Sequence, residues 1–481
     1  MANPGAARDT SDPPPGFDEW LNERASAAER IALQRDAETP RVGPALVVVR
    51  KFVEERGLVL LGGQAIDYAL RLKGKELYPP GNRPDYDFFS PDSVKDAYDL
   101  AELLRRGGFA NVSAIRAIHI QTMRVGTDFI YVGDVGYAPP VVLDRIPTLV
   151  YEGVRLVHPD YQRCDMHLGL SFPLENPPRV TIDHRFAKDL KRLRMLEDAY
   201  PMRPLPDAPL ARTTDAGGAI RIVSALAIKG PNPPSAALGG FVAYAMYRKK
   251  YAEMRGDRGL PDVPGPAIGP GRVPAGCDVD LASPDVPATM EALGDAGNVT
   301  WYYPYMDLFP VSARITVGGQ GITVQSTKNR LLLMTEIDGT WTVSVHYAMM
   351  QLQARSFIEA TASVRAVNRA CYIALFHMTE AVNGSYRERP PADGAAAPFA
   401  LGGHVLGNKN VSVARRIKTQ VTRKLLKTPD PILEAIPDRY FLPAPRPAPF
   451  DYGSSPMFHR AGEVVDAADA MLIAALPQVV I

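Results

Sequence analysis

The sequence lacks several features that mark specialised protein classes. Its three cysteines in 481 residues are scattered, and their spacing forms neither a disulfide framework nor a zinc-binding pattern, which favours a reducing compartment. No apolar run approaches the roughly 20 residues that a membrane helix needs. Lys and Arg (54) balance Asp and Glu (53), so net charge alone does not indicate a nucleic-acid-binding protein. With 46% hydrophobic and 22% charged residues, the composition is that of a globular protein with two or three domains.

The basic residues are unevenly distributed along this balanced chain. Five lie in the stretch 185–194 and six in the stretch 415–427. A basic run is usually a solvated helix face. Because the first run follows a carboxylate-rich stretch, we favour binding of a polyanion.

Hydrophobic spacing in the first 205 residues predicts a mixed α/β arrangement. Helices are expected at 45–56, 64–75 and 92–107, and strands at 58–61, 85–89, 117–124 and 129–137, the last two pairing around a turn at 125–127. Pro- and Gly-rich segments at 201–218 and 256–276 indicate a domain boundary and a long loop. Helices are expected again at 345–382 and over the second basic run.

Two aspartates, Asp85 and Asp87, lie two residues apart on a predicted strand. Side chains alternate along a strand, so both carboxylates are expected on one face, where their oxygens suit Mg²⁺. A two-ion site needs a further carboxylate. Asp134, on the strand expected to pair beside them, is the best candidate, and Asp128 at the edge of a turn is its competitor.

A glycine pair, Gly62-Gly63, lies at the strand-to-helix junction that precedes the aspartates. Glycines at such a junction let the backbone approach a triphosphate, and the N–H groups of a helix N-terminus bind phosphate. Alone, a glycine pair is usually a turn, and an Asp-x-Asp pair is seldom a metal site. Their order along the chain favours phosphoryl transfer, which needs positioning and charge neutralisation.

The second half of the chain repeats four short segments of the first half in the same order. The pairs are Leu61-Gly62-Gly63 with Leu238-Gly239-Gly240, Tyr68-Ala69-Leu70 with Tyr244-Ala245-Met246, Asp85-x-Asp87-x-x-Ser90-Pro91-Asp92 with Asp278-x-Asp280-x-x-Ser283-Pro284-Asp285, and Asn111-Val112-Ser113 with Asn298-Val299-Thr300. We interpret them as a duplicated domain, with the Gly- and Pro-rich loop inserted into the second copy.

The second copy keeps Asp278 and Asp280, but its later strand, at 321–326, offers Gln or Ser where a third carboxylate is needed. Two carboxylates could hold one cation weakly, but they do not make a full two-ion site. We therefore expect this copy to be catalytically silent.

The glycine pair, the Asp-x-Asp pair and the sequence around them resemble the polymerase-β-like nucleotidyltransferase superfamily. The closer resemblance is to the poly(A) polymerase catalytic subunits of poxviruses and other large DNA viruses. The resemblance covers about residues 58–205 and rests on LGGQAIDYAL (61–70), RPDYDFFSPD (83–92), YVGDVGYAP (131–139), HPDYQRCDMHLGLSFPLENP (158–177) and RFAKDLKRLRMLEDAYP (185–201). The C-terminal half matches more loosely, through GNKNVSV (407–413).

The resemblance implies an α+β fold: a polymerase-β-like nucleotidyltransferase domain, with a mixed sheet flanked by helices, followed by a second, degenerate nucleotidyltransferase-like domain with C-terminal helices. We expect this second domain to serve RNA binding or subunit contacts. The expected boundaries are a flexible N-terminal tail at 1–40, the catalytic domain at 41–205, the degenerate domain at 206–385, and a helical and loop region at 386–481 packed on the second domain.

The resemblance also implies roles for individual residues. Asp85, Asp87 and Asp134 are the implied catalytic residues and the ligands of two Mg²⁺ or Mn²⁺ ions. Gly62 and Gly63 line the ATP phosphates, and Lys188 contacts the triphosphate or RNA, with weaker support. The signature further includes Arg163, Asp165 and His167, for which a structural role, such as a buried Arg–Asp pair, is the commoner explanation.

The implied activity is template-independent addition of AMP from ATP to RNA 3′ ends, in mRNA polyadenylation. The implied partners are ATP and RNA, with a homodimer or a separate processivity subunit, and no membrane; the implied locations are viral factories in the host-cell cytoplasm and the virion. Tyr302, Tyr303 and Tyr305 are candidate platforms for RNA bases, although aromatic residues beside a proline more often belong to a core. The alternatives are a non-catalytic RNA-binding subunit with a vestigial site, and an Asp-x-Asp glycosyltransferase.

Overall fold

The computed structural model describes residues 42–79, 84–117, 122–171, 182–203, 212–218, 220–221, 236–283, 286–294, 299–302, 306, 308, 310, 312–327, 334–359, 361–383 and 398–399. The expected N-terminal tail, the second basic run and the GNKNVSV segment lie outside these residues, as do Tyr303 and Tyr305. All three cysteines are buried and free. No helix of the described ranges is long and apolar enough to cross a membrane.

The first half is built on a seven-stranded sheet with the strand order β3-β4-β5-β2-β1-β7-β6. Its strands are β1 (Val59–Leu61), β2 (Tyr86–Ser90), β3 (Ser113–Arg116), β4 (Thr122–Thr127), β5 (Ile130–Tyr137), β6 (Thr148–Tyr151) and β7 (Val154–Val157). Strands β2 and β5 run parallel, as do β1 and β7, whereas the other neighbours are antiparallel. The sheet is therefore mixed, as predicted.

The described helices of the first half are α2 (Val42–Glu55), α3 (Gly62–Arg71), α4 (Ser93–Arg106), α5 (Pro140–Leu143), α6 (Pro159–Ser171) and α7 (Ile182–Ala199). Of these, α2, α3 and α4 pack on the sheet, and α6 and α7 pack on other helices. The buried residues of α2 recur every three or four positions, at Val42, Ala45, Leu46, Val49, Phe52 and Val53. This spacing gives the helix one apolar face, and that face packs on β2, β5 and β7.

The second half repeats this architecture strand for strand, with the order β12-β13-β14-β11-β9-β16-β15. Its strands are β9 (Ala237–Leu238), β11 (Val279–Ser283), β12 (Thr300–Tyr302), β13 (Ser312–Val317), β14 (Gln320–Ser326), β15 (Met334–Ile337) and β16 (Thr340–Val343). Its helices are α9 (Gly240–Arg258), α10 (Val286–Leu293), α11 (Val345–Ile358) and α12 (Ala362–Val382). A separate pair, β8 (Thr213–Asp215) and β10 (Arg272–Pro274), is antiparallel. The predicted α+β fold with two related halves is confirmed.

The strand register corrects two details of the predicted repeat. Asp87 pairs with Asp134 across β2 and β5, and Asp280 pairs with Thr323 across β11 and β14. The expectation of Gln or Ser at the position of the third carboxylate is therefore wrong, because Thr323 occupies it.

The second correction concerns the glycines. Leu61 pairs with Asp87, and the Gly239 N–H donates to the Asp280 carbonyl. Helix α3 begins at Gly62, directly after Leu61, and helix α9 begins at Gly240, directly after Gly239. Gly240, rather than Gly239, is thus the counterpart of Gly62, so the alignment at the helix starts is one residue away from the one suggested by the sequence, whereas the predicted match of Asp87 with Asp280 holds.

Three local expectations also differ from the structure. The predicted turn at 125–127 belongs to β4, and the hairpin instead turns at Asp128 and Phe129, both of which have positive φ. Strand β3 has no counterpart among the expected elements. The expected loop at 256–276 is shorter at both ends, because α9 continues to Arg258 and β10 occupies 272–274.

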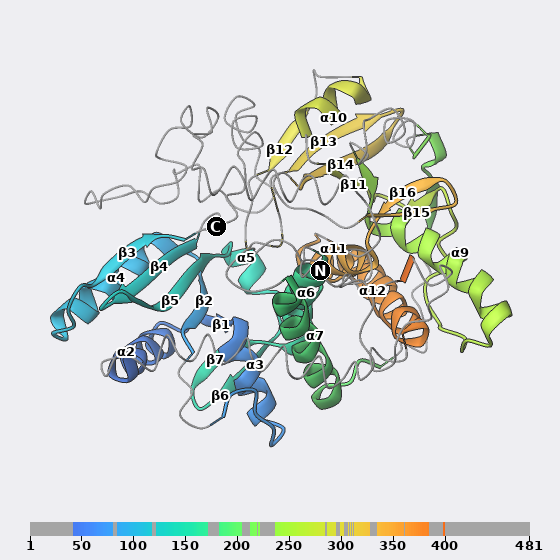
Figure 1. Ribbon diagram of the computed structural model, residues 1–481. Coiled ribbons are helices and arrows are strands. Elements are labelled where there is room, and N and C mark those ends of the chain that lie inside the picture. Colours follow the sequence, from blue (N-terminus) through green and yellow to red (C-terminus); the bar gives the residue numbers. More distant parts are fainter. Residues whose placement is uncertain are drawn as a thin grey trace, which may run out of the picture.

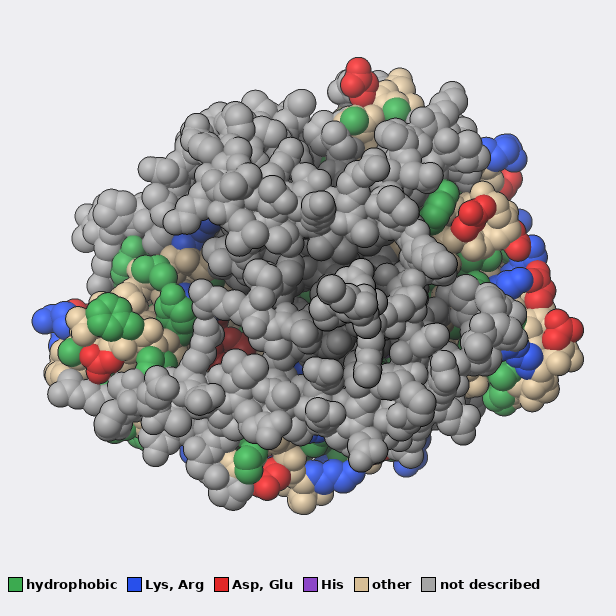
Figure 2. Space-filling view, viewed as in Figure 1, with side chains coloured by type: hydrophobic (Ala, Val, Ile, Leu, Met, Phe, Trp, Pro, Cys, Tyr) green, Lys and Arg blue, Asp and Glu red, His purple; other side chains and the backbone are tan. Residues whose placement is uncertain are grey.

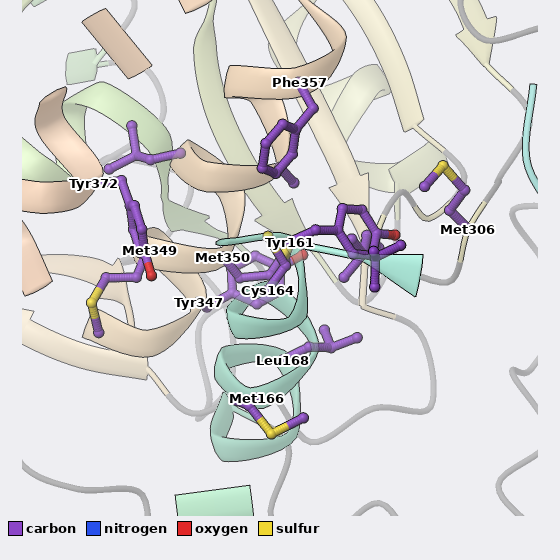
Figure 3. Packing of buried hydrophobic residues seen from close by; sticks show 14 of the residues in the cluster. Tyr161, Cys164, Met166, Leu168, Met306, Tyr347, Met349, Met350, Phe357 and Tyr372 are labelled. Atoms are coloured by element: carbon purple, nitrogen blue, oxygen red, sulfur yellow. The ribbon is translucent and has the colours of Figure 1, made fainter. Parts of the chain in front are cut away.

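The two halves meet through helices that occupy equivalent places in the repeat, α6 and α11, with α12 beside them (Figure 1). Figure 3 shows Tyr161 and Cys164 of α6 packed among side chains of α11 and α12. At this interface the rings of His167 and His346 stack with centroids 5.4 Å apart. Their Nδ1 atoms are 3.2 Å apart, and the His167 Nε2 lies 3.2 Å from the Tyr372 hydroxyl.

This histidine pair makes the stability of the protein depend on pH. Burial lowers the pKa of His346 to about 3 and holds the pKa of His167 well below its usual range. Histidines of the unfolded chain titrate near 6.5, so unfolding in acid takes up protons that the folded state does not bind. Stability that is fully present above about pH 6.5 is expected to fall by about 1.4 kcal/mol per pH unit for each histidine as the pH decreases.

Urea unfolding between pH 7 and pH 5 measures this dependence. His346→Gln should show a shallower loss of stability than the unmodified chain, because one of the two titrating rings is absent. His377→Gln, which removes a histidine of α12 outside the stacked pair, should keep the full dependence. Equal pH dependence in His346→Gln and the unmodified chain would contradict this assignment.

Candidate active site

Three neighbouring strands place charged residues in one row across the first sheet. Asp87 on β2 pairs with Asp134 on β5, and Asp134 pairs with Arg124 on β4. Directly paired residues project from the same face of a sheet. Asp85 precedes the first residue of β2, two positions before Asp87. The structure therefore brings together the three aspartates predicted from the sequence and adds an arginine to them.

The carboxylates of this row are crowded. Burial, followed by the charges of Asp85 and Asp134, holds the pKa of Asp87 well above its usual range, against the opposing effect of Arg124 and Arg192. A raised carboxylate pKa means that the negative form lacks sufficient compensating charge. A divalent cation with oxygen ligands would supply that charge, so the donor set fits Mg²⁺ or Mn²⁺ in kind.

Arg124 occupies the third carboxylate. Its Nε donates to Asp134 Oδ1 at 2.7 Å and its Nη2 to Oδ2 at 2.5 Å, while the two side chains are 24% and 13% exposed. Within the part of the chain that the structure describes, no three His, Cys, Asp or Glu side chains are placed to hold a metal ion. The three predicted carboxylates are thus close together, but the third, Asp134, is bound by the guanidinium of Arg124.

The glycine pair is required by its close neighbours. Gly62, the first residue of α3, has a φ of +70°, and a Cβ there would overlap Oδ2 of Asp87. A Cβ on Gly63 would overlap the Tyr78 hydroxyl. Leu61 provides no side-chain cap for α3, and a helix start of this kind presents N–H groups that suit phosphate. The N-terminus of α3 therefore lies directly beside Asp87.

Helix α7 contributes basic residues to the same end of α3. Arg192 donates to the Tyr78 hydroxyl at 2.8 Å, and its Nη2 lies 3.0 Å from the position of a Cβ on Gly63. Lys188, the residue predicted from the sequence, lies one turn earlier on α7 and hence on the same helix face. Sequence reasoning placed Arg192 only in a basic run; its contact with the glycine pair is visible in the structure alone.

Other residues of the predicted signature take part in packing. Arg163 is fully buried and donates to Asp160 at 3.0 Å and to Glu197 at 2.8 Å, so its carboxylate partners are these two residues, on α6 and α7. His167 belongs to the interface between the halves. Asp128, the competitor for the third ligand position, lies in the hairpin turn, where it accepts from Asn111 Nδ2 at 3.4 Å.

In the second copy, protein side chains occupy the corresponding positions. Arg314 donates to Asp278 through Nε at 2.7 Å and Nη2 at 3.1 Å, and the Thr323 hydroxyl donates to Asp278 at 2.7 Å. Arg355 forms an ion pair with Asp280, and these two side chains are 12% and 0% exposed. Burial nevertheless raises the pKa of Asp280 to about 7.

The start of α9 is also closed. The Gly240 N–H donates to Gln351 Oε1 at 2.9 Å. Leu60 and Leu238 each lie two residues before the equivalent glycines Gly62 and Gly240. Their strand partners, Leu156 and Thr342, are therefore also equivalent. Counting the same number of residues forward from each partner aligns Gly169 of α6 with Arg355 of α11. The first copy therefore has no side chain at the position from which Arg355 fills the second copy.

The first half of the chain is similar in sequence to known viral proteins. Residues 47–176 match a family model described as poly(A) polymerase catalytic subunit. Over 230 residues, 48% of the chain, the sequence is 44% identical to a putative poly(A) polymerase catalytic subunit of African swine fever virus (isolate Tick/Malawi/Lil 20-1/1983), of which it covers 46%. A mimivirus protein of the same name is 26% identical over 157 residues, which are 32% of this chain and 26% of that protein. The predicted resemblance is confirmed, and the chain spans about half the length of the African swine fever virus relatives it matches.

The fold has a solved counterpart. The crystal structure of the Megavirus polyadenylate synthase matches with a TM-score of 0.60 at 16% sequence identity, over 92% of this chain and 90% of that one. At this identity the likeness concerns the fold, and it extends across both halves of the chain.

The contact between Gly62 and Asp87 can be tested through stability. Gly62→Ala suffers left-handed backbone strain of about 1–2 kcal/mol and in addition displaces the Asp87 carboxylate. Gly74 also has a positive φ, +68°, but its Cβ would meet open space, so Gly74→Ala suffers the strain alone. In urea unfolding of the full chain, Gly62→Ala should be the less stable variant. Equal unfolding midpoints would show that the close approach is unimportant.

Proposed function

We propose that this chain is a template-independent polynucleotide adenylyltransferase, which adds AMP from ATP to RNA 3′ ends during mRNA polyadenylation. One observation supports it most directly: the two halves share a fold, yet Arg355, which forms a buried ion pair with Asp280 in the second half, is replaced by Gly169 at the aligned position of the first half. In the first half, the start of α3 lies against Asp87, whose carboxylate is close to Asp85 and Asp134. This is the arrangement expected of a site that receives cations and phosphate.

The proposed roles follow from these positions. Asp85, Asp87 and Asp134 would hold two Mg²⁺ or Mn²⁺ ions, which when bound lower the pKa of the RNA 3′-hydroxyl and stabilise the negative charge of the leaving pyrophosphate. The backbone at Gly62 and Gly63, at the start of α3, would receive the triphosphate.

The remaining chemistry is positioning. Arg192 and Lys188, on one face of α7, would neutralise phosphate oxygens through charge-assisted hydrogen bonds. The 3′ oxygen forms its bond to the α-phosphorus as the bond from that phosphorus to pyrophosphate breaks. Such a displacement requires alignment and charge neutralisation from the protein, with no covalent intermediate.

The proposed partners are ATP and RNA, together with a second copy of the chain or a separate processivity subunit, at viral factories in the host-cell cytoplasm or in the virion. Neither alternative function has equal support. The glycosyltransferase alternative requires an extended Rossmann-like first half, whereas this sheet has antiparallel neighbours on both sides of its centre. A non-catalytic subunit would not require the crowding of carboxylates around Asp87.

Extension of an RNA primer with each of the four nucleotides, in Mg²⁺ and in Mn²⁺, tests the activity. We expect extension with ATP. The double variant Asp85→Ala/Asp87→Ala should lose roughly 10³-fold or more, because several kcal/mol of transition-state charge stabilisation disappears with the ions. Absence of extension by the unmodified chain with every nucleotide would refute the proposed function.

The silence of the second copy is tested by Asp278→Ala beside Asp87→Ala in the same assay. Asp278 is bound by Arg314 and Thr323, so its removal should leave extension near the level of the unmodified chain, with thermal melting used to verify folding. If Asp278→Ala folded normally and lost extension as completely as Asp87→Ala, both copies would have to take part in catalysis.

A further inference from the structure

Arg124 binds Asp134 in a way that competes with a metal ion. The guanidinium uses two parallel N–H···O bonds, one to each carboxylate oxygen, and this fork satisfies the carboxylate as a bound cation would. A divalent ion placed beside the guanidinium would also meet its positive charge at close range. Asp134 can therefore serve either Arg124 or a metal ion well, but not both in the same arrangement.

A β-bulge places an aromatic ring under this arginine. Val125 pairs with Gly133, but Gly126 pairs with Tyr131, so Val132 is left without a direct partner. The extra residue turns Tyr131 to the face that carries Arg124 and Asp134. The guanidinium carbon lies 4.6 Å from the centroid of the Tyr131 ring, and the tyrosine is 45% exposed. Arg124 thus stacks on an exposed ring while it binds Asp134, so its guanidinium lies on the solvent side of the site.

In the second copy, two arginines lie against the aspartates. Arg314 pairs with Thr323 across β13 and β14, as Arg124 pairs with Asp134 across β4 and β5. In the second copy, Arg355 adds a deeply buried positive charge beside Asp280. The first copy keeps the equivalent of Arg314 and has Gly169 in place of Arg355, so it retains the more accessible arginine and lacks the buried one.

We propose that Arg124 is an exchangeable counter-ion, which neutralises Asp134 in the unliganded chain and moves to a phosphate oxygen of an incoming substrate, leaving Asp134 to the metal. This inference rests on the proposed function, because it takes Asp134 as a metal ligand. The phosphate would belong to a triphosphate or to the RNA backbone. Movement of Arg124 to the phosphate frees Asp134 for the metal ion, and binding of the metal ion to Asp134 frees Arg124 for the phosphate. Binding of phosphate and binding of metal should therefore each strengthen the other.

The test compares Arg124→Leu with the unmodified full-length chain in two separate binding measurements. Without any phosphate ligand, Mn²⁺ affinity measured by electron paramagnetic resonance should increase about tenfold, a change equivalent to about 1.4 kcal/mol, because Asp134 is released. In EDTA, affinity for tripolyphosphate or for a short RNA oligonucleotide should decrease by a similar factor. The ligand whose affinity falls identifies the source of the phosphate.

Opposite changes in the two affinities distinguish exchange from a merely structural role, in which the variant would weaken both or neither. Arg124→Lys, which keeps the charge but loses the fork, should give intermediate values and serves as the test if Arg124→Leu does not fold. Arg314→Leu is the matched control: it removes the equivalent arginine of the second copy while Arg355 remains, so both affinities should stay unchanged.

Two contrary results have different meanings. If Asp87→Asn abolishes Mn²⁺ binding but Arg124→Leu leaves Mn²⁺ affinity unchanged or lower, or leaves both phosphate affinities unchanged, Arg124 is not an exchangeable counter-ion and the proposed function stands. If neither the unmodified chain nor Arg124→Leu binds Mn²⁺, the metal site itself is absent, and the proposed function fails together with this inference.

Discussion

Buried carboxylates need compensating positive charge, and this constraint governs the site in both halves of the chain. Asp87 and Asp280 occupy the same strand position, each against the first glycine of a helix. In the second half, Arg355 supplies the charge from within the protein. In the first half, Gly169 stands at the aligned position and supplies no such charge, while burial and the charges of Asp85 and Asp134 hold the pKa of Asp87 well above its usual range. One fold therefore supports two sites that differ in a few side chains, above all in the buried arginine that only the second site has among the described residues.

The architecture makes this contrast possible because it fixes the carboxylates through backbone pairing. Parallel pairing of β2 with β5 sets Asp87 beside Asp134, and the antiparallel hairpin of β4 and β5 adds Arg124. Helices α6 and α11 hold the halves together through the buried His167–His346 contact. On the face of the molecule shown in Figure 2, the coloured acidic and basic side chains are interspersed, with no single patch of one sign, which agrees with the balanced composition.

Much of this was accessible from the sequence, and the reasons for the failures are physical. Alternation along a strand was enough to group Asp85 with Asp87, and the order of glycines and aspartates indicated the type of site. Arg124 was missed because the hairpin turn was expected at 125–127, a register in which Arg124 cannot face Asp134; residues with positive φ such as Asp128 give little local signal. Thr323, likewise, can be aligned with Asp134 only through strand pairing, which depends on contacts between distant segments.

The central claim is that the chain contains one site for cations and phosphate and one internally neutralised copy of it. Anomalous X-ray diffraction from crystals grown with Mn²⁺ and a non-hydrolysable ATP analogue tests this claim most directly. The account predicts anomalous density among Asp85, Asp87 and Asp134, with the triphosphate at the start of α3, and none between Asp278 and Asp280. Mn²⁺ bound at Asp278 and Asp280, or density absent from the first half with the analogue bound elsewhere, would contradict it.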